Sequence, residues 1–318
     1  MSRKVAHLLL LTTAFLWGIN FISLKYLSGI FPTFSLVFIK YGIASLFMWF
    51  ILIQKRKKDS SLKTLERVDY KNIFITGLLG FSLYSYFQLF SFTYLSANLA
   101  ALLCALVPIF SLIAEQVFSK KRCALATYFL SMLSIFGVYL VLDMRPKELF
   151  ASNAVWGILL MTLANICWVA YTMQTTKLQD KYGSFTSLTF QMTAGTFVLG
   201  LTAIKDFQLA LSTLTSSSNA LIIVLNLLFL GIGTSALAYL FYIEGMKVIG
   251  IQLASLYINV LPVVTAIVSF FVFKEQFSMQ QMTGMLLVVS SIVLINKVEA
   301  RSKQDNSKRH TEYSVSST

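Results

Sequence analysis

The stretch "NVLPVVTAIVSFFVFKE" (residues 259–275) has the character of a membrane helix with a proline inside it. A proline within a helix removes one backbone hydrogen bond and presses on the carbonyl four residues earlier. In a bilayer no water replaces that bond. The pattern also occurs in "ALVPIFSLIAEQVFSKK" (residues 105–121), so that Pro108 and Pro262 lie 154 residues apart. An internal repeat with one kinked helix in each copy explains both prolines.

The composition points to a membrane as the solvent. The chain has 318 residues, of which 57% are hydrophobic and only 12% are charged, whereas soluble domains carry roughly a quarter charged residues. A single soluble core cannot bury this much apolar surface. A helix crosses the bilayer with roughly 20 mostly apolar residues. Ten such runs are predicted, at residues 7–27, 34–53, 72–94, 97–118, 125–142, 154–173, 185–204, 220–243, 249–273 and 280–296.

Charge in the connections between these runs predicts the orientation. Cytoplasmic loops of membrane proteins are enriched in Lys and Arg. With the N-terminus inside, 20 basic residues fall on the cytoplasmic side and 4 on the outer side, and seven of the 20 lie in residues 54–71. The count favours a multi-pass protein of the cell membrane with both termini in the cytoplasm, which requires an even number of crossings.

A comparison of the chain with itself supports the repeat. A shift of 154 residues superposes Pro108 on Pro262 and gives nine identities over 44 positions, among them Gly77 on Gly231. A shift of 151 residues in the earlier part superposes Trp17 on Trp168. Each copy then holds five predicted spans, and because five is odd the second copy enters the membrane from the opposite side.

The expected fold is therefore an all-α integral membrane protein with ten transmembrane helices, arranged as two inverted five-helix repeats. Residues 9–142 form the first module and residues 154–296 the second. Residues 297–318 contain too few apolar side chains to pack, so a disordered cytoplasmic tail is expected there. Inverted repeats are common among secondary transporters, whose binding site lies near the membrane midplane between the repeats.

Three stretches carry a family resemblance: "FLWGINFISLKYL" (15–27), "LGIGTSALAYLFYIEGMKVIGIQLASLYINVLPVVTAIVSFFVFKEQ" (230–276) and "GMLLVVSSIVLIN" (284–296). In this order they resemble the EamA-type permeases of the drug/metabolite transporter superfamily, with two EamA modules over about residues 9–296. The resemblance implies a ten-helix carrier that moves small metabolites without ATP hydrolysis. The chain has Lys40 where the family often has an arginine in the second helix.

Polar and aromatic side chains inside the predicted spans are the candidate binding residues. Trp17 and Asn20 lie in the first span and are mirrored by Asn165 and Trp168 in the sixth. Indole and amide groups suit a site that stacks on a substrate and orients it by hydrogen bonds. Lys40 lies about 9 Å deep in the second span, at about 1.5 Å per residue. The full candidate set is Trp17, Asn20, Lys40, Asn165, Trp168, Tyr239, Tyr257 and Asn259.

Each candidate also has a plainer interpretation. Amides inside membrane proteins often bridge helices, typically for about 1 kcal/mol each. A lysine at that depth can extend to the interface, and membrane tyrosines often only pack or anchor. We interpret Pro108 and Pro262 as helix-kink residues that free the carbonyls of Cys104 and Ile258 toward a central cavity. Ordinary kinked packing is the alternative.

The sequence favours transport over catalysis. The two histidines, His7 and His310, lie at opposite ends of the chain, and no HExxH motif or paired carboxylate falls in mid-span. No metal, cofactor or nucleic-acid partner is expected.

We expect a secondary transporter, not an enzyme, that moves small metabolites or amino-acid-like solutes across the cell membrane by alternating access, in the direction of export. Its partners are a small-molecule substrate and the lipid bilayer, and its state is a monomer or homodimer. The alternative is a non-transport membrane protein, such as a membrane-embedded enzyme or a sensor.

Overall fold

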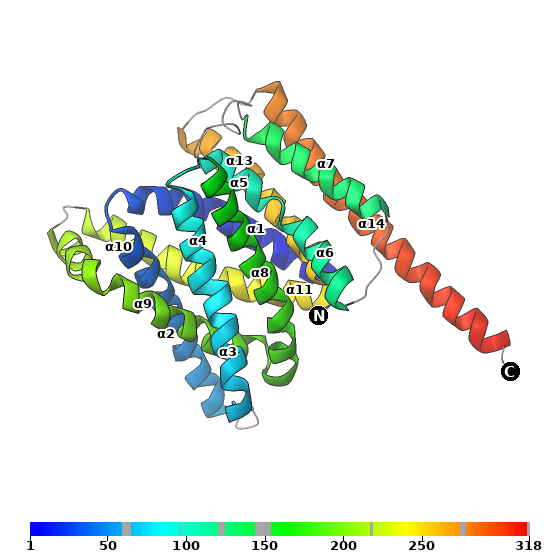
Figure 1. Ribbon diagram of the computed structural model, residues 1–318, viewed down its shortest axis with the longest axis horizontal. Helices are drawn as coiled ribbons and strands as arrows, with labels where there is room; N and C mark the ends of the chain where they lie inside the picture. Colours follow the sequence, from blue (N-terminus) through cyan, green and yellow to red (C-terminus); the bar gives the residue numbers. More distant parts are fainter. Residues whose placement is uncertain are drawn as a thin grey trace.

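The computed structural model describes residues 1–58, 65–95, 97–119, 125–143, 154–216, 219–273 and 278–316, and this part of the chain is helical with short turns and no strand (Figure 1). The elements of the first half are α1 (Arg3–Ser28), α2 (Thr33–Lys58), the 3₁₀ turn η1 (Arg67–Asp69), α3 (Tyr70–Gly77), the π-helical segment η2 (Leu78–Leu83), α4 (Tyr84–Ser91), α5 (Ala97–Cys104), α6 (Val107–Ser119) and α7 (Leu125–Val141). Those of the second half are α8 (Ala154–Tyr182), α9 (Ser184–Ser216), α10 (Ala220–Leu228), the π-helical segment η4 (Phe229–Leu237), α11 (Ala238–Ile249), α12 (Ile251–Leu256), the 3₁₀ turn η5 (Tyr257–Val260), α13 (Leu261–Phe273) and α14 (Met279–Ser316).

The lengths and surfaces of these helices are those of a multi-pass membrane protein. Within the described residues, nine helices are long and apolar enough to cross a bilayer, and α7 is a shorter apolar helix of 17 residues. Large apolar side chains lie on the outside, such as Leu46 at 73% exposure and Phe129 at 70%. The prediction of an all-helical integral membrane protein is confirmed, whereas ten crossings stay a prediction because α7 is at the short end for a span.

The third helix of each half contains a π-helical segment. In the first half it is Leu78–Leu83, and in the second half it is Phe229–Leu237, which includes the counterpart of the first segment in the repeat. Gly77, just before the first segment, and Gly231, the third residue of the second, allow close approach to the other half. A Cβ added at Gly77 would lie 2.3 Å from the carbonyl oxygen of Gln191, and one added at Gly231 would lie 2.5 Å from Cγ2 of Ile43. π-helical turns occur frequently at functional sites.

The fourth helix of each half is interrupted just before its proline. α5 ends at Cys104, two turn residues follow, and Pro108 is the second residue of α6. Pro262 is likewise the second residue of α13, after the 3₁₀ turn η5. The first turn of a helix tolerates proline because its N–H groups have no intrahelical acceptor. The expectation of a free carbonyl at Ile258 is wrong, because that carbonyl accepts the Leu261 N–H in the tighter turn.

Contacts between the two halves follow a reciprocal pattern. α1 packs on α11 and α13, and its counterpart α8 packs on α4 and α6. α2 packs on its counterpart α9, and α7 lies along α14 (Figure 1). At the α7–α14 contact, a Cβ added at Gly137 would lie 2.9 Å from the carbonyl oxygen of Gly284, and one added at Gly284 would lie 2.6 Å from that of Gly137.

Two side-chain contacts join matching positions of the halves. The ring centroids of Trp17 and Trp168, which are equivalent residues of the repeat, lie 5.6 Å from each other. The hydroxyl oxygens of Ser45 and Thr196, which are equivalent in the same alignment, are 3.0 Å from each other. The helix pairs α1–α8 and α2–α9 therefore meet at equivalent residues.

The last helix differs from the expectation for the end of the chain. The backbone of α14 continues as a helix to Ser316, whereas the sequence predicts a disordered tail from residue 297. Extending an existing helix requires much less free energy than starting one, and the apolar turns of α14 already pack on α7. Figure 1 shows the far end of α14 directed away from the other helices. That the tail is dispensable stays a prediction.

Candidate functional site

Four aromatic side chains gather where the two halves meet, and we call them the aromatic centre: Trp17 of α1, Trp168 of α8, and Tyr239 and Tyr242 of α11. The Trp17 centroid lies 5.6 Å from that of Trp168 and 5.4 Å from that of Tyr239. The Trp168 centroid lies 5.6 Å from that of Tyr239 and 5.5 Å from that of Tyr242. Most of these rings meet edge to face or tilted, which is a favourable geometry for aromatic pairs. The centre is a largely buried apolar cluster whose Trp and Tyr side chains have polar edges.

A chain of hydrogen bonds lies against the aromatic centre, and we call Lys40, Asn20 and Thr234 the polar chain. Lys40 Nζ donates to Asn20 Oδ1 at 3.3 Å, and Thr234 Oγ1 lies 2.8 Å from the same oxygen and 2.8 Å from the Leu230 carbonyl, which share its one O–H. Trp17 Nε1 donates to the Thr234 carbonyl at 2.9 Å, which joins the chain to the aromatic centre. Thr234 belongs to the π-helical segment η4. The polar chain therefore connects α1, α2 and η4.

Helical periodicity explains why the polar chain faces inward. On α1 the outward face carries Leu8 at 62% and Phe15 at 51% exposure. At about 100° per residue, Asn20 lies roughly 140° around the helix from Phe15, on the side that faces the bundle. Lys40 Nζ meets this inward face of α1, 5.2 Å from the ring centroid of the neighbouring Tyr41. The Lys40 ammonium thus lies inside the bundle rather than along the membrane surface.

Tyr41 connects the polar chain to Tyr239 of the aromatic centre. Its hydroxyl oxygen lies 3.1 Å from that of Tyr239, and both residues are almost fully buried. Tyr239 stacks on Phe81, which belongs to the π-helical segment η2, at 5.1 Å between centroids. Sequence reasoning missed Tyr41, Tyr242 and Thr234. The spacing of Tyr242, three residues after Tyr239 on one helix face, could have indicated it.

Asn165, one of the predicted binding residues, lies in a structural contact. Its Nδ2 donates to the Leu103 carbonyl at 2.7 Å, next to the interruption between α5 and α6. The Leu103 carbonyl also accepts the Leu106 N–H at 3.1 Å in this turn, so Asn165 adds a second donor from another element. Asn165 Nδ2 therefore bridges α8 to the interrupted helix, while its buried Oδ1 has no hydrogen-bond partner among the described residues, and its role in binding stays a prediction.

Two further candidates make their polar contacts at other helix junctions. Asn259 Nδ2 donates to Ser134 Oγ at 3.0 Å, and the asparagine is fully buried. The Tyr257 hydroxyl lies 2.6 Å from His7 Nδ1, near the start of α1. The structure thus brings together Trp17, Asn20, Lys40, Trp168 and Tyr239, and leaves Asn165, Tyr257 and Asn259 in separate contacts.

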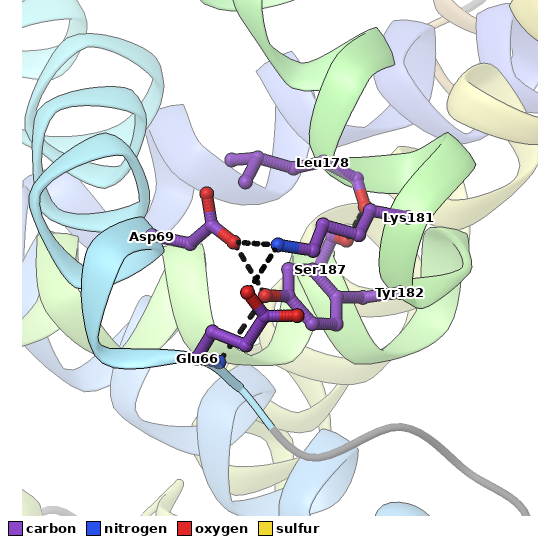
Figure 2. A network of polar contacts seen from close by, with 6 residues as sticks. All are labelled: Glu66, Asp69, Leu178, Lys181, Tyr182 and Ser187. Carbon is purple, nitrogen blue, oxygen red and sulfur yellow. Dashed lines mark hydrogen bonds and ion pairs between the residues drawn. The ribbon is translucent and has the colours of Figure 1, made fainter.

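An ionic cluster joins the two halves at one end of the bundle (Figure 2). Lys181 Nζ, at the end of α8, lies 2.8 Å from Glu66 Oε2 and 2.7 Å from Asp69 Oδ2. The Tyr182 hydroxyl donates to the same Asp69 oxygen and accepts the Glu66 backbone N–H at 3.2 Å. The segment before α3 is thereby tied to the end of α8.

The fold and the site together define a multi-pass helical membrane protein with an aromatic and polar centre between two similar halves. The chain belongs to the EamA-like transporter family, whose model matches residues 4–143 and 155–297. The predicted membership of this family is confirmed, and the drug/metabolite transporter superfamily is consistent with it.

Relatives support the same assignment. The chain is 27% identical over 304 residues to "Uncharacterized transporter YyaM" of Bacillus subtilis (strain 168), which covers 94% of this chain and 95% of that protein. It is 24% identical over 288 residues to an "Uncharacterized transporter" of Archaeoglobus fulgidus, with 90% and 96% covered. A solved structure titled "Crystal structure of protein" matches with a TM-score of 0.77 and 19% identity, over 95% of this chain and 99% of that one, and shows the shared fold. Family and relatives point to a membrane transporter rather than an enzyme.

Proposed function

We propose that the protein is a secondary transporter that moves small metabolites or amino-acid-like solutes out of the cell by alternating access. The substrate binds at the aromatic centre and the polar chain. The observation that carries this proposal is their position, since Trp17, Trp168 and Tyr239 lie where the two halves of the chain meet. In carriers built from repeats, substrate sites lie at such a junction.

Reciprocal packing supports two halves related by an approximate twofold axis. In a twofold arrangement, a contact between element i and element j is repeated between their counterparts, and residues near the axis meet their own equivalents. The Trp17–Trp168 and Ser45–Thr196 contacts have this second property. With five crossings per half, the axis lies in the membrane plane and the repeats are inverted.

The two ends of the bundle also carry equivalent contacts. A buried apolar cluster at one end contains Leu27, Phe31 and Leu227. Their counterparts in the repeat are Leu178, Tyr182 and Ile73, which cluster at the other end beside the ionic cluster. An alternating carrier needs such a pair of contact regions, one on each side of the site, because opening to one side requires separation there and closure at the other.

The charge distribution supports the orientation of this carrier. The excess of Lys and Arg in the connections favours an orientation with both termini and the ionic cluster on the cytoplasmic side of the cell membrane. Glu66, Asp69, Lys181 and Tyr182 then hold the cytoplasmic ends of the two halves together. The buried cluster at the opposite end, around Phe31, consists of apolar side chains.

The test begins with an unbiased comparison of metabolites inside and outside cells that lack or overproduce the protein. A solute that accumulates outside overproducing cells is then loaded into vesicles with purified protein, and its counterflow is measured. Saturable exchange that Trp17→Phe and Asn20→Ala weaken by about threefold or more supports the proposal, because a lost hydrogen bond costs roughly 0.5–1.5 kcal/mol. Absence of flux for every accumulated solute, with folded protein in the vesicles, would refute it.

A further inference from the structure

We propose that the substrate carries a compact oxyanion, such as a carboxylate, which binds Lys40, and an apolar or aromatic body, which lies on the aromatic centre. This inference rests on the proposed function, because it assigns the charge and shape of the solute at the same site. It follows from the contacts of Lys40 and of the aromatic centre.

Among the described residues, the Lys40 ammonium has few hydrogen-bond acceptors and no ion pair. An ammonium has three N–H donors, and in this part of the chain Lys40 Nζ makes one hydrogen bond, to the amide oxygen of Asn20 at 3.3 Å. Thr234 Oγ1 shares this oxygen at 2.8 Å. The ion pairs in which both partners lie in the described part of the chain join Lys181 to Glu66 and Asp69. A charge inside a membrane protein that lacks a counter-ion is costly, and such residues usually mark a substrate or ion pathway.

Local geometry argues against a purely structural role for Lys40. A structural lysine at this depth would be expected to pair with a carboxylate or to reach the headgroups. Lys40 instead lies against Asn20 and the face of Tyr41. An aromatic face attracts a cation but leaves its N–H groups free for an anionic oxygen, so an incoming oxyanion would supply both the missing acceptors and the missing charge.

The aromatic centre supplies the surface for the rest of the solute. Trp168 and Tyr242 are buried in this centre, and Trp168 Nε1 lies beside the Tyr242 hydroxyl without reaching normal hydrogen-bond geometry. Buried polar groups are nearly always paired, and a polar atom of a bound solute would complete the weak pairing of these two groups. The edges of Trp17 and Tyr239 complete an apolar wall next to the polar chain. A cation is disfavoured at this site by Lys40 itself.

The test uses three probes with one phenyl ring and one propyl chain: 3-phenylpropanoate, 3-phenylpropanol and 3-phenylpropylamine. Thermal unfolding midpoints of the purified full-length protein are measured with each probe at equal concentration and ionic strength. Stabilisation reports binding to the folded state. We expect 3-phenylpropanoate to raise Tm clearly more than the alcohol and the amine. Lys40→Met should remove this difference, and Lys40→Arg should retain most of it.

Matched controls keep the test decisive. Lys247→Met removes the same charge from an exposed position on α11 and should leave the preference for the anion unchanged. Should Lys40→Met fail to fold, Lys40→Gln takes its place. A Tm shift with the anion no larger than with the alcohol, or an anion shift that survives Lys40→Met, overturns the inference. Saturable flux of a neutral or cationic solute would refute this inference and leave the proposed transport intact, whereas anion binding without any flux would refute transport and leave this inference intact.

Discussion

Asn20→Asp is the sharpest perturbation of the site, because it changes one atom at the centre of the polar chain. The amide oxygen of Asn20 accepts from Lys40 Nζ and from Thr234 Oγ1. Aspartate has nearly the same shape and keeps an oxygen in that place, so both hydrogen bonds survive. The change adds a negative charge 3.3 Å from the Lys40 ammonium and gives the lysine an internal counter-ion.

The expected magnitudes follow from that distance. At an effective dielectric constant of about 20, two unit charges 3.3 Å apart attract by about 5 kcal/mol. Removing the new carboxylate from water costs several kcal/mol, so the net stabilisation is about 0–2 kcal/mol. A substrate oxyanion must then compete with a carboxylate that is already tethered. If it loses about 1.4–2.8 kcal/mol of its interaction with Lys40, its affinity falls about ten- to a hundredfold.

The assay measures thermal unfolding of the purified protein and binding of 3-phenylpropanoate by its Tm shift. Asn20→Asp should leave Tm equal or higher and weaken binding of the anion. Asn20→Ala removes the shared acceptor without adding charge, so it should lower both Tm and binding, since an unmade hydrogen bond to a charged group costs about 1.5–3 kcal/mol. An Asn20→Asp variant that is less stable than Asn20→Ala, or that binds the anion as well as the unchanged protein, would contradict the reasoning.

Three further predictions test the orientation, the tail and the packing. A cysteine in residues 54–71 should react with an impermeant thiol reagent only from the cytoplasmic side, and one in residues 205–219 only from outside; in a cysteine-free background, the reverse labelling would overturn the topology. Deletion from Arg301 onward should leave membrane expression and flux nearly unchanged, and an inactive product would show that the tail binds the body or a partner. Gly77→Ala should lower Tm through overpacking of about 1–3 kcal/mol, since its Cβ would lie 2.3 Å from a carbonyl oxygen, whereas Gly42→Ala meets nothing within 4 Å and should be nearly neutral.

Sequence reasoning identified the elements that depend on local composition and on the repeat. Apolar length predicts helices that cross a bilayer, and the alignment of the chain with itself selected Trp17 and Trp168, which are in contact in the structure. When two halves are related by an approximate twofold axis, equivalent residues close to that axis must lie close to each other. The Trp17–Trp168 contact could therefore be predicted without knowing how each helix is rotated about its own axis.

The partners of the mid-span polar residues could not be predicted in this way. Asn20 and Asn165 are both amides on inward faces, yet one meets Lys40 and the other meets the carbonyl of Leu103. Which partner each amide meets depends on the rotation of its helix and on the conformation of the backbone nearby. Neither the π-helical turn that carries Thr234 nor the interruption after α5 has a residue pattern that fixes its extent.

The two halves share a backbone plan but differ in chemistry at equivalent positions near the site. Lys40 corresponds to Gln191 in the repeat, yet Gln191 is fully buried and bonded on both ends of its amide, to Thr76 and Thr175. A neutral residue with complete hydrogen bonds stabilises packing and offers nothing to a solute.

The positions of Asn20 and Thr234 and their counterparts in the repeat also differ in polarity. Asn20 and Thr234 make a hydrogen bond, whereas their counterparts Tyr171 and Gly80 pack ring against backbone, so that a Cβ added at Gly80 would lie 2.6 Å from the ring. In the alignment of the two halves, Lys40, Asn20 and Thr234 form a polar set, whereas the equivalent Gln191, Tyr171 and Gly80 form packing contacts, in which the buried Tyr171 hydroxyl has no hydrogen bond of normal geometry among the described residues. This difference between the two sets fits the proposed binding of an oxyanion on an apolar body in a single orientation.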